Sequence, residues 1–229
     1  MKPAMHLGTS PVRTDAPAKV RGTLRYTDDV IRPGPLHAAV LFSPQAHAEI
    51  KKIDTTAAAA ARGVRGVFTG ADWPDILIGL YMGDKPPLAR GKVRHHGEPV
   101  AVVVADEEAI AQNALRLVKV EYAPLPALGS PHEALAPGAP VLHPDMAKYA
   151  RIPDILPEPG TNIANRTKIR KGDPARAFAE ADAVVEGEFS FPPGDHVAME
   201  PRVAIAEYGA DGRLEIDSST QSPFEVRNL

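Results

Sequence analysis

The chain contains no cysteine among its 229 residues. Without thiols it forms no disulfide, offers no cysteine nucleophile and holds neither a zinc ribbon nor an iron–sulfur cluster of its own. Aromatic residues make up only 5% of the sequence, which is low for a protein that stacks on bases or sugars. The net charge of −3 also lacks the positive excess that sequence-independent nucleic-acid binding requires. The composition therefore predicts no nucleic-acid partner.

Long hydrophobic runs are missing from the sequence. No apolar run approaches the roughly 20 residues that cross a bilayer, so we expect no membrane partner. The first 13 residues lack the apolar core of a secretory signal. These features predict a cytoplasmic location, and a periplasmic one stays open if a partner subunit carries an export signal.

Common catalytic motifs are missing too. The sequence has no GxGxxG after a predicted strand, no GxxxxGK[ST] phosphate loop, no GxSxG elbow and no HExxH. Each motif places particular side chains on a particular turn or helix, and so the chemistry must be sought elsewhere.

The elements that are present predict an α+β fold. Alternating residues and short apolar runs indicate strands, because they match the two-residue period of a sheet. The expected strands are 36–42, 47–53, 64–69, 98–105, 118–122, 183–191, 203–208 and 214–218, the last two forming a hairpin.

Capping residues predict where the first helices begin. Thr55 or Thr56 would cap a short helix at 57–61, and Asp106 would cap the helix that follows strand 98–105. Further on, Asp173 before a proline predicts another helix start.

The last residues form a capping-box pattern. Ser222 would be the cap, Pro223 the first helical position and Glu225 the third, so a helix should begin at Pro223. The sequence stops at Leu229, within two turns of this start. The expectation is a truncated chain.

Proline makes up 24 of the 229 residues, and its distribution divides the chain. The prolines between Pro124 and Pro159 predict an extended connection, whose interspersed apolar residues should pack on a surface. The predicted regions are an N-terminal arm at 1–18, a domain at 19–125, a proline-rich connection at 126–164 and a second domain beginning at 165–229. The arm is interpreted as solvated, with docking to a partner as the alternative.

Four groups of polar residues are candidate sites. His196 with Glu200, and His143 with Asp145, are weak candidates for metal binding because prolines surround both pairs. Ser218 to Gln221 lies between a strand end and a capped helix, where polar side chains can donate to an oxyanion or oxo ligand. The fourth group is a basic cluster, interpreted as a solvated turn with anion or partner contact as the alternative: Arg90, Lys92, Arg94, His95 and His96.

A series of short motifs runs across nearly the whole chain. They are Arg13-x-Asp15, Lys19-Val-x-Gly22, Tyr26-x-x-Asp29, Leu36-His-Ala, Ser43-Pro-x-Ala46-x-Ala48-x-Ile50, Ile53-Asp54, Gly63-Val-x-x-Val67, Gly97-Glu-Pro through Ala105, Val118-x-Val-x-Tyr122-x-x-Leu125-Pro126, Asn162, Gly172-Asp173, Ala181-Asp182-x-Val184-Val185, His196-x-x-Met199-Glu-Pro201 and Ser219-Thr-Gln221. In this order they resemble the N-terminal part of the molybdopterin-binding large subunit of the xanthine dehydrogenase/aldehyde oxidase family.

The resemblance implies a fold and an activity. Residues 19–125 would be the aldehyde oxidase/xanthine dehydrogenase α/β hammerhead domain, and 165–229 the beginning of the molybdopterin-binding domain. The complete enzyme would hydroxylate aldehydes or N-heterocycles with water as the oxygen source. The large subunit of the complete enzyme would bind molybdenum–molybdopterin in a dinucleotide form, and the partner subunits would bind iron–sulfur clusters and FAD. The partners would be the remainder of the large subunit, an iron–sulfur small subunit and a flavin-binding medium subunit.

At residue level the resemblance implies one cofactor-binding residue, Gln221. It matches the family glutamine that hydrogen-bonds an oxo ligand of molybdenum; an amide can donate there without adding charge. No catalytic residue and no metal ligand carries over. The family's glycine-rich cofactor loop and general-base glutamate are not among these residues, so this chain alone is expected to be inactive and to expose apolar patches. The alternatives are a non-catalytic interaction or scaffold module of the same ancestry and an unrelated α+β binding protein.

Overall fold

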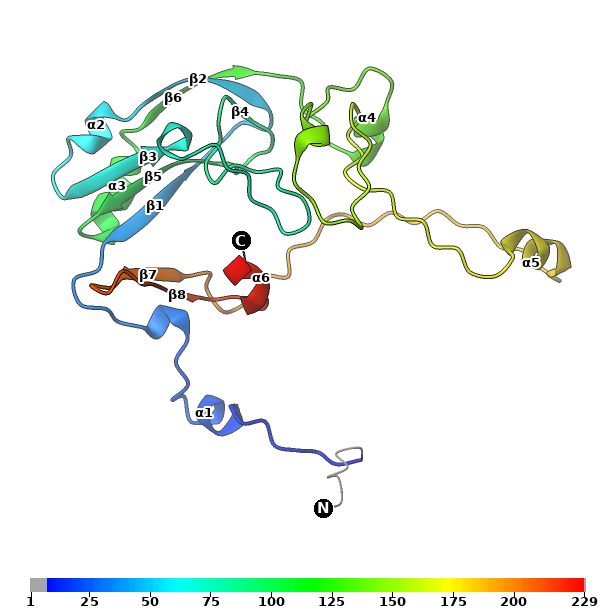
Figure 1. Cartoon of the computed structure of the whole chain (residues 1–229), viewed down its shortest axis with the longest axis horizontal. Coiled ribbons are helices and arrows are strands. Elements are labelled where there is room, and N and C mark those ends of the chain that lie inside the picture. Colours follow the sequence, from blue (N-terminus) through cyan, green and yellow to red (C-terminus); the bar gives the residue numbers. More distant parts are fainter. Residues whose placement is uncertain (1–7, 229) are drawn as a thin grey trace. The chain divides into compact units, whose positions relative to one another are not determined.

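The computed structural model describes residues 8–228 (Figure 1). Its contacts divide the chain into two compact units. The larger unit is residues 34–186, and the smaller joins the described part of 1–33 to 187–228. Helices and strands are mixed in the element order, which confirms the predicted α+β class. The domain boundaries predicted from the sequence stay predictions.

The first sheet of the larger unit has the order β1-β5-β3. Its strands are β1 (His37–Phe42), β5 (Pro99–Ala105) and β3 (Val64–Thr69), and both pairings are antiparallel. The central strand β5 is the apolar run that the sequence singled out, and Val100, Val103 and Ala105 on it are fully buried. A strand with neighbours on both sides and cover on both faces can be apolar throughout.

The second sheet has the order β4-β2-β6 and is also antiparallel. It consists of β4 (Lys92–Val93), β2 (Ala48–Asp54) and β6 (Lys119–Pro124). Ile53 and Val120 pack against the buried clusters of both sheets. The two sheets therefore share one hydrophobic core, and the strands predicted in this region are confirmed.

Helix α3 (Glu108–Leu115) joins β5 to β6, which lie in different sheets. It packs on β1 and β5, and its buried alanines allow the close approach. The prediction that Asp106 caps this helix is wrong, because Glu107 occupies the N-cap position. The Asp106 carboxylate instead accepts two hydrogen bonds from the guanidinium of Arg65, at 2.6 and 2.9 Å.

Helix α2 spans Thr56–Ala59, shorter than the predicted 57–61. Thr55 occupies the N-cap position, but its side chain makes no capping hydrogen bond. The Asp54 carboxylate accepts from the Thr56 amide at 3.0 Å instead, and this bond is the main reason why the pKa of Asp54 is lowered. The predicted cap position at Thr55 is thus confirmed, while the capping hydrogen bond comes from the preceding residue, Asp54. Helix η2 (Gly70–Asp72) follows β3.

The proline-rich connection contains short helices rather than extended chain alone. Helix α4 (Pro131–Leu135) begins after Ser130, whose hydroxyl accepts from the Glu133 amide at 3.2 Å. Helix η3 (Met146–Lys148) carries a buried methionine. Of the apolar residues that were expected to pack, Tyr149 is buried while Ile152 and Leu156 are exposed.

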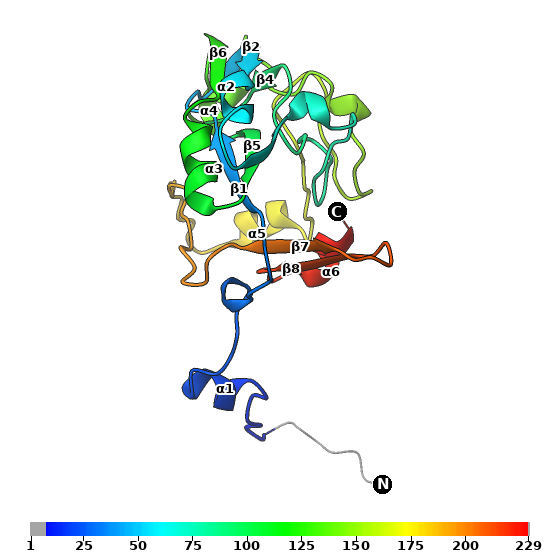
Figure 2. The same ribbon diagram turned by 90° about the vertical axis from the view of Figure 1, so that its left-hand side faces the viewer.

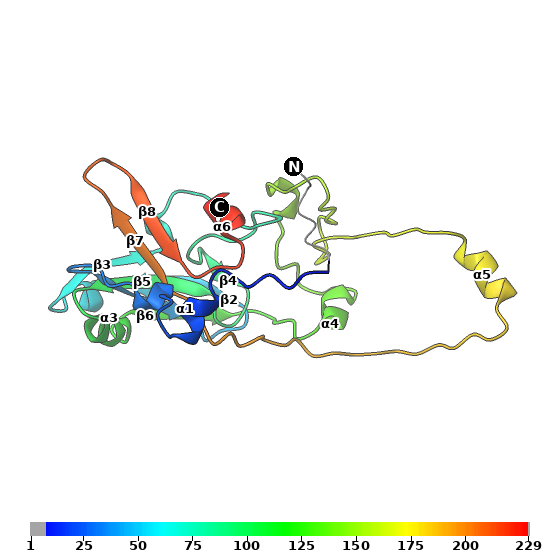
Figure 3. The same ribbon diagram turned by 90° about the horizontal axis from the view of Figure 1, so that it is seen from below.

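Helix α5 (Pro174–Glu180) follows the connection, with extended chain on both sides (Figure 3). The Asp173 carboxylate accepts from the Arg176 amide at 3.1 Å, which confirms the predicted cap. The strand predicted at 183–191 is wrong, since no element is formed there. Phe189 and Phe191 are more than four-fifths exposed. Alternation alone does not make a strand, because no strand among residues 8–228 pairs with this segment.

The smaller unit contains the predicted hairpin. Strands β7 (Ala204–Tyr208) and β8 (Leu214–Ser218) pair antiparallel and lie side by side in Figure 2. Helix α6 (Pro223–Asn228) begins where the sequence predicted. Leu229, on which the truncation expectation rests, lies outside the described residues. The N-terminal part of the unit contributes two short helices, α1 (Ala16–Val20) and η1 (Thr27–Asp29).

None of the helices within residues 8–228 combines the length and the apolar character that crossing a membrane requires.

Candidate functional site

The polar segment between β8 and α6 is anchored by one serine. The Ser219 hydroxyl donates to the Pro201 carbonyl and accepts from the Val203 amide, both at 3.0 Å. The Ser219 amide donates to the Val203 carbonyl, also at 3.0 Å. Two motifs that are separate in the sequence, 199–201 and 219–221, are thereby joined at this end of the hairpin.

Gln221 is the predicted cofactor-binding residue, and it lies on the short turn that follows. The Ser222 amide donates to the Thr220 hydroxyl at 3.0 Å, which bends the chain directly before α6. The Gln221 side chain is exposed, and among residues 8–228 it has no hydrogen-bond partner. The turn therefore places the side-chain amide of Gln221 between the end of a strand and the start of a helix, where it is free to form hydrogen bonds.

Arg32 is a structural residue of the same unit that the sequence reasoning missed. Its guanidinium lies 2.8 Å from Asp217, 3.2 Å from Glu215 and 3.5 Å from Glu207. The hydrogen bond to Asp217 is the main reason why the pKa of Arg32 is raised. The three carboxylates alternate with apolar residues along β7 and β8. That alternation was the available signal for an acidic face that needs a cation.

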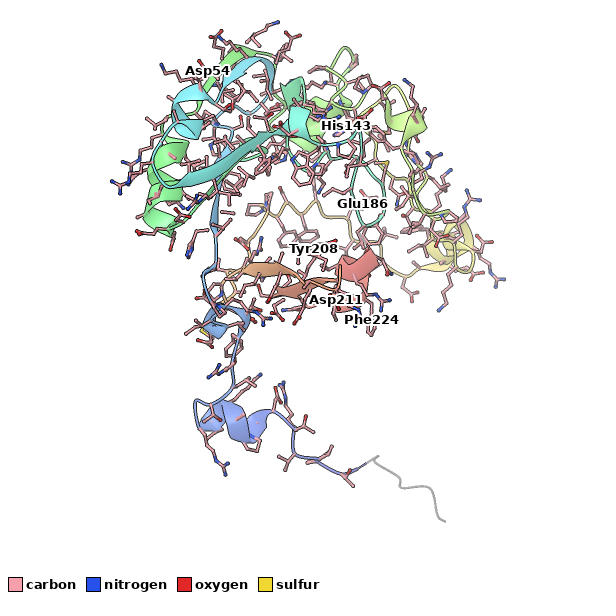
Figure 4. The ribbon with its side chains drawn as sticks, turned by 60° about the vertical axis from the view of Figure 1, so that its left-hand side comes forward. Asp54, His143, Glu186, Tyr208, Asp211 and Phe224 are labelled. Atoms are coloured by element: carbon pink, nitrogen blue, oxygen red, sulfur yellow. The ribbon has the colours of Figure 1, made fainter. Side chains whose placement is uncertain are left out.

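The opposite face of the hairpin is apolar and open. The strand register places Ala206 opposite Ile216 and Tyr208 opposite Leu214, on the face away from the carboxylates. Tyr208 and Phe224 are both largely exposed, and Figure 4 marks them with Asp211 of the turn. This openness agrees with the expectation that the chain alone exposes apolar patches.

His196 and Glu200 lie on a segment without regular secondary structure. The segment around them has no helix, so the two residues do not share a helical face. His196 lies 3.4 Å from its neighbour Asp195 and is largely exposed. Within residues 8–228, no three His, Cys, Asp or Glu side chains gather as metal ligands do.

His143 and Asp145 also point to different partners. The Nδ1 atom of His143 lies 3.2 Å from the Tyr149 hydroxyl, and the two rings meet edge to face. Burial is the main cause that lowers the pKa of His143, and the cation of Arg94 adds to it. Asp145 accepts from Lys148 at 2.6 Å. His143 lines a cavity of about 400 Å³ in the larger unit and is labelled in Figure 4.

Two arginines of the basic cluster brace loops. The Arg90 guanidinium donates to three carbonyls, of Gly70, Trp73 and Pro74. Arg94 donates to the Leu142 carbonyl at 3.3 Å. Burial lowers the pKa of Lys92, and Arg94 lowers it further. These contacts give Arg90 and Arg94 a structural role, which differs from the solvated turn that we expected, whereas His95 and His96 are exposed.

Two family models match the chain. The model described as "Aldehyde oxidase and xanthine dehydrogenase, a/b hammerhead domain" matches residues 21–126. The "Molybdopterin cofactor-binding domain" model matches residues 155–229. Gln221 lies within the second match.

Curated relatives and solved structures agree with these models. A probable xanthine dehydrogenase subunit of Bacillus subtilis is 35% identical over 219 residues, covering 95% of this chain and 27% of the relative. The nicotinate dehydrogenase large molybdopterin subunit of Eubacterium barkeri is 32% identical, covering 96% of this chain and 49% of the relative. The solved quinoline 2-oxidoreductase from Pseudomonas putida 86 superimposes with a TM-score of 0.79 at 35% identity, over 96% of this chain and 28% of that one. The chain thus spans between about a quarter and a half of the length of these relatives.

Proposed function

The chain belongs to the xanthine dehydrogenase/aldehyde oxidase family, of whose large subunit it comprises the hammerhead domain and the beginning of the molybdopterin-binding domain, and we propose that it serves in a molybdenum hydroxylase. The complete enzyme would oxidise an aldehyde or an N-heterocycle with water as the oxygen source. The observation that carries the proposal is the free amide of Gln221 at the junction of β8 and α6.

The donors at this junction fit a neutral contact to an oxo group. The Ser219 hydroxyl donates its proton to the Pro201 carbonyl, so this serine has a structural role. Gln221 keeps both amide protons free, and its side chain is uncharged. Bound molybdopterin would supply the molybdenum centre that takes two electrons from the substrate. Toward it, Gln221 would donate one hydrogen bond and orient an oxo ligand, while Ser219 holds the turn in place.

The finer parts of the proposal concern cofactors and partners. The cofactor would be a molybdopterin dinucleotide, and iron–sulfur clusters and FAD would reside on partner subunits. Those partners would be an iron–sulfur subunit and a flavin subunit, together with the remainder of the large subunit, in the cytoplasm. These 229 residues by themselves should show no turnover, since they contain neither the family's glycine-rich loop nor its general-base glutamate.

The test of this role compares two glutamine variants of the assembled enzyme. Gln221→Ala should lower turnover by about 10- to 100-fold at unchanged subunit composition, as is typical when a group that orients a metal ligand is removed. Gln112→Ala is the matched control, because Gln112 is exposed on α3 in the other unit and should leave turnover unchanged. Unchanged kinetics of the Gln221 variant at full molybdenum occupancy would defeat the proposed role.

A further inference from the structure

The loop between η2 and β4 exposes a run of large apolar side chains. Six of them lie within nine positions, each between 37% and 58% exposed. Together they present on the order of 500 Å² of apolar surface, at the upper end for a single chain. We call these residues the apolar strip: Trp73, Ile76, Leu77, Ile78, Leu80 and Tyr81.

Backbone hydrogen bonds to neighbouring segments hold the apolar strip in a defined conformation. Ile78 pairs with Lys85 through both of its backbone groups, at 2.7 and 3.3 Å. The Ile152 amide donates to the Tyr81 carbonyl at 3.0 Å, which attaches the strip to the proline-rich connection. At the turn, a Cβ on Gly79 would overlap the Met82 carbonyl oxygen, so only glycine fits. A preordered apolar surface loses little entropy when it is covered.

A cationic groove borders the apolar strip at Trp73. This groove of about 610 Å³ is lined by Trp73, Lys51, Lys52 and Arg90 among others, and its lining contains no carboxylate. The Arg90 guanidinium donates to backbone carbonyls and to the Asp75 carboxylate at 3.1 Å, and Lys51 pairs with Glu49. Lys52 is exposed and forms no salt bridge in the part of the chain described, so it is available to an incoming anion.

We propose that the apolar strip and the cationic groove are the docking surface for the remaining, molybdopterin-binding part of the large subunit, which contributes apolar side chains and a carboxylate. This inference rests on the proposed function, in that the remaining part exists; about three-quarters of the Bacillus relative lies outside the match. A second copy of this chain is the alternative occupant, because an isologous contact would place the apolar strip on both sides of the interface. The exposed apolar area supplies the centre of a standard interface of roughly 800 Å² per partner.

The experiment compares the native complex with the 229-residue chain alone. Amide hydrogen exchange across the apolar strip should be slowed in the complex. A zero-length carbodiimide should couple Lys52 to a carboxylate of the remaining large subunit, and Lys52→Gln should remove that product. Leu77→Glu combined with Leu80→Glu should raise exchange of the strip in the complex by roughly 30-fold or more, as expected when central interface residues are lost. Leu135→Glu is the control, because Leu135 is an exposed leucine of α4 that does not belong to the apolar strip.

The outcomes separate the two proposals. The apolar strip could exchange equally fast in the complex and in the lone chain, although the complex contains the remaining part of the large subunit and molybdenum. This result would overturn the proposed docking surface and leave the proposed function standing. A Lys52 cross-link to a second copy or to another subunit would overturn it as well. A complex that contains no further large-subunit sequence would refute both proposals.

Discussion

Removing the side chain of Asn162 should loosen the proline-rich connection. The Asn162 amide oxygen accepts from the Leu142 amide at 2.9 Å. Its nitrogen donates to the Ala134 and Pro140 carbonyls at 3.1 and 3.0 Å. One half-buried side chain thus joins three points of the connection. Asn162→Ala would leave one donor and two acceptors without their partners.

The magnitude follows from the three bonds. Each is worth about 0.5–1.5 kcal/mol net, so the local free energy of opening should fall by about 2–3 kcal/mol. Every 1.4 kcal/mol is about tenfold in an equilibrium, which corresponds to amide exchange roughly 30- to 150-fold faster at Leu142. Hydrogen exchange followed by mass spectrometry measures this directly.

Asn165→Ala is the control for this experiment. Asn165 is exposed and makes only one backbone bond, to the Leu156 amide at 2.8 Å. Its loss should change exchange around Leu142 by less than about threefold, because the two sites share no partner. Amide exchange at Leu142 that is as slow in Asn162→Ala as in the parent chain would refute the role of Asn162 in stabilising the proline-rich connection.

Three further predictions concern other single residues. Arg32→Met should speed thermolysin cleavage of the N-terminal segment, because the three ion pairs of Arg32 attach this segment to the β7–β8 hairpin. Gly79→Ala should destabilise the turn by about 1–3 kcal/mol, because the new Cβ would overlap the Met82 carbonyl oxygen, and thermal denaturation should show it. Burial lowers the pKa of His143 below its ordinary value of 6.5, so the unfolded chain takes up the proton first as the pH falls. The neutral His143 side chain therefore favours folding above pH 6.5, and this contribution is lost as the pH falls through the pKa of His143 in the folded chain. His143→Gln should remove this pH dependence, so the melting temperature should decline less between neutral and mildly acidic pH.

Matched variants decide each of these predictions. Arg213→Met removes an exposed arginine of the hairpin turn and should not change cleavage of the N-terminal segment; equal cleavage in both variants would contradict the role of Arg32. Gly194→Ala adds a Cβ in open space, and a melting temperature no higher than that of Gly79→Ala would contradict the overlap argument. His132 is exposed on α4; an identical pH response of His132→Gln and His143→Gln would contradict the effect of burial.

Local patterns predicted most of the strands, because a sheet face is encoded by neighbouring residues. Strand β5 and the hairpin of β7 and β8 were found for this reason. Contacts between distant residues were not predicted. Asp106 looks like a helix cap until Arg65, 41 residues away, takes its carboxylate. The segment 183–191 has the alternation of a strand, but no neighbouring sequence can show whether it has a partner.

The candidate site divides in the same way. Its position before α6 was predictable from the capping pattern of Ser222 and Pro223. The role of Gln221 came from the family resemblance and not from its own surroundings. Arg32 was missed because two of its carboxylate partners, Glu215 and Asp217, lie more than 180 residues further along the chain.

The most direct test of the central claim is to tag the chain in its native host, purify it gently and measure molybdenum, iron and flavin together with the co-purifying polypeptides. Membership of a molybdenum hydroxylase predicts stoichiometric molybdenum in a complex with iron–sulfur and flavin polypeptides. A lone, metal-free polypeptide would contradict the proposed function and favour a non-catalytic module of the same ancestry.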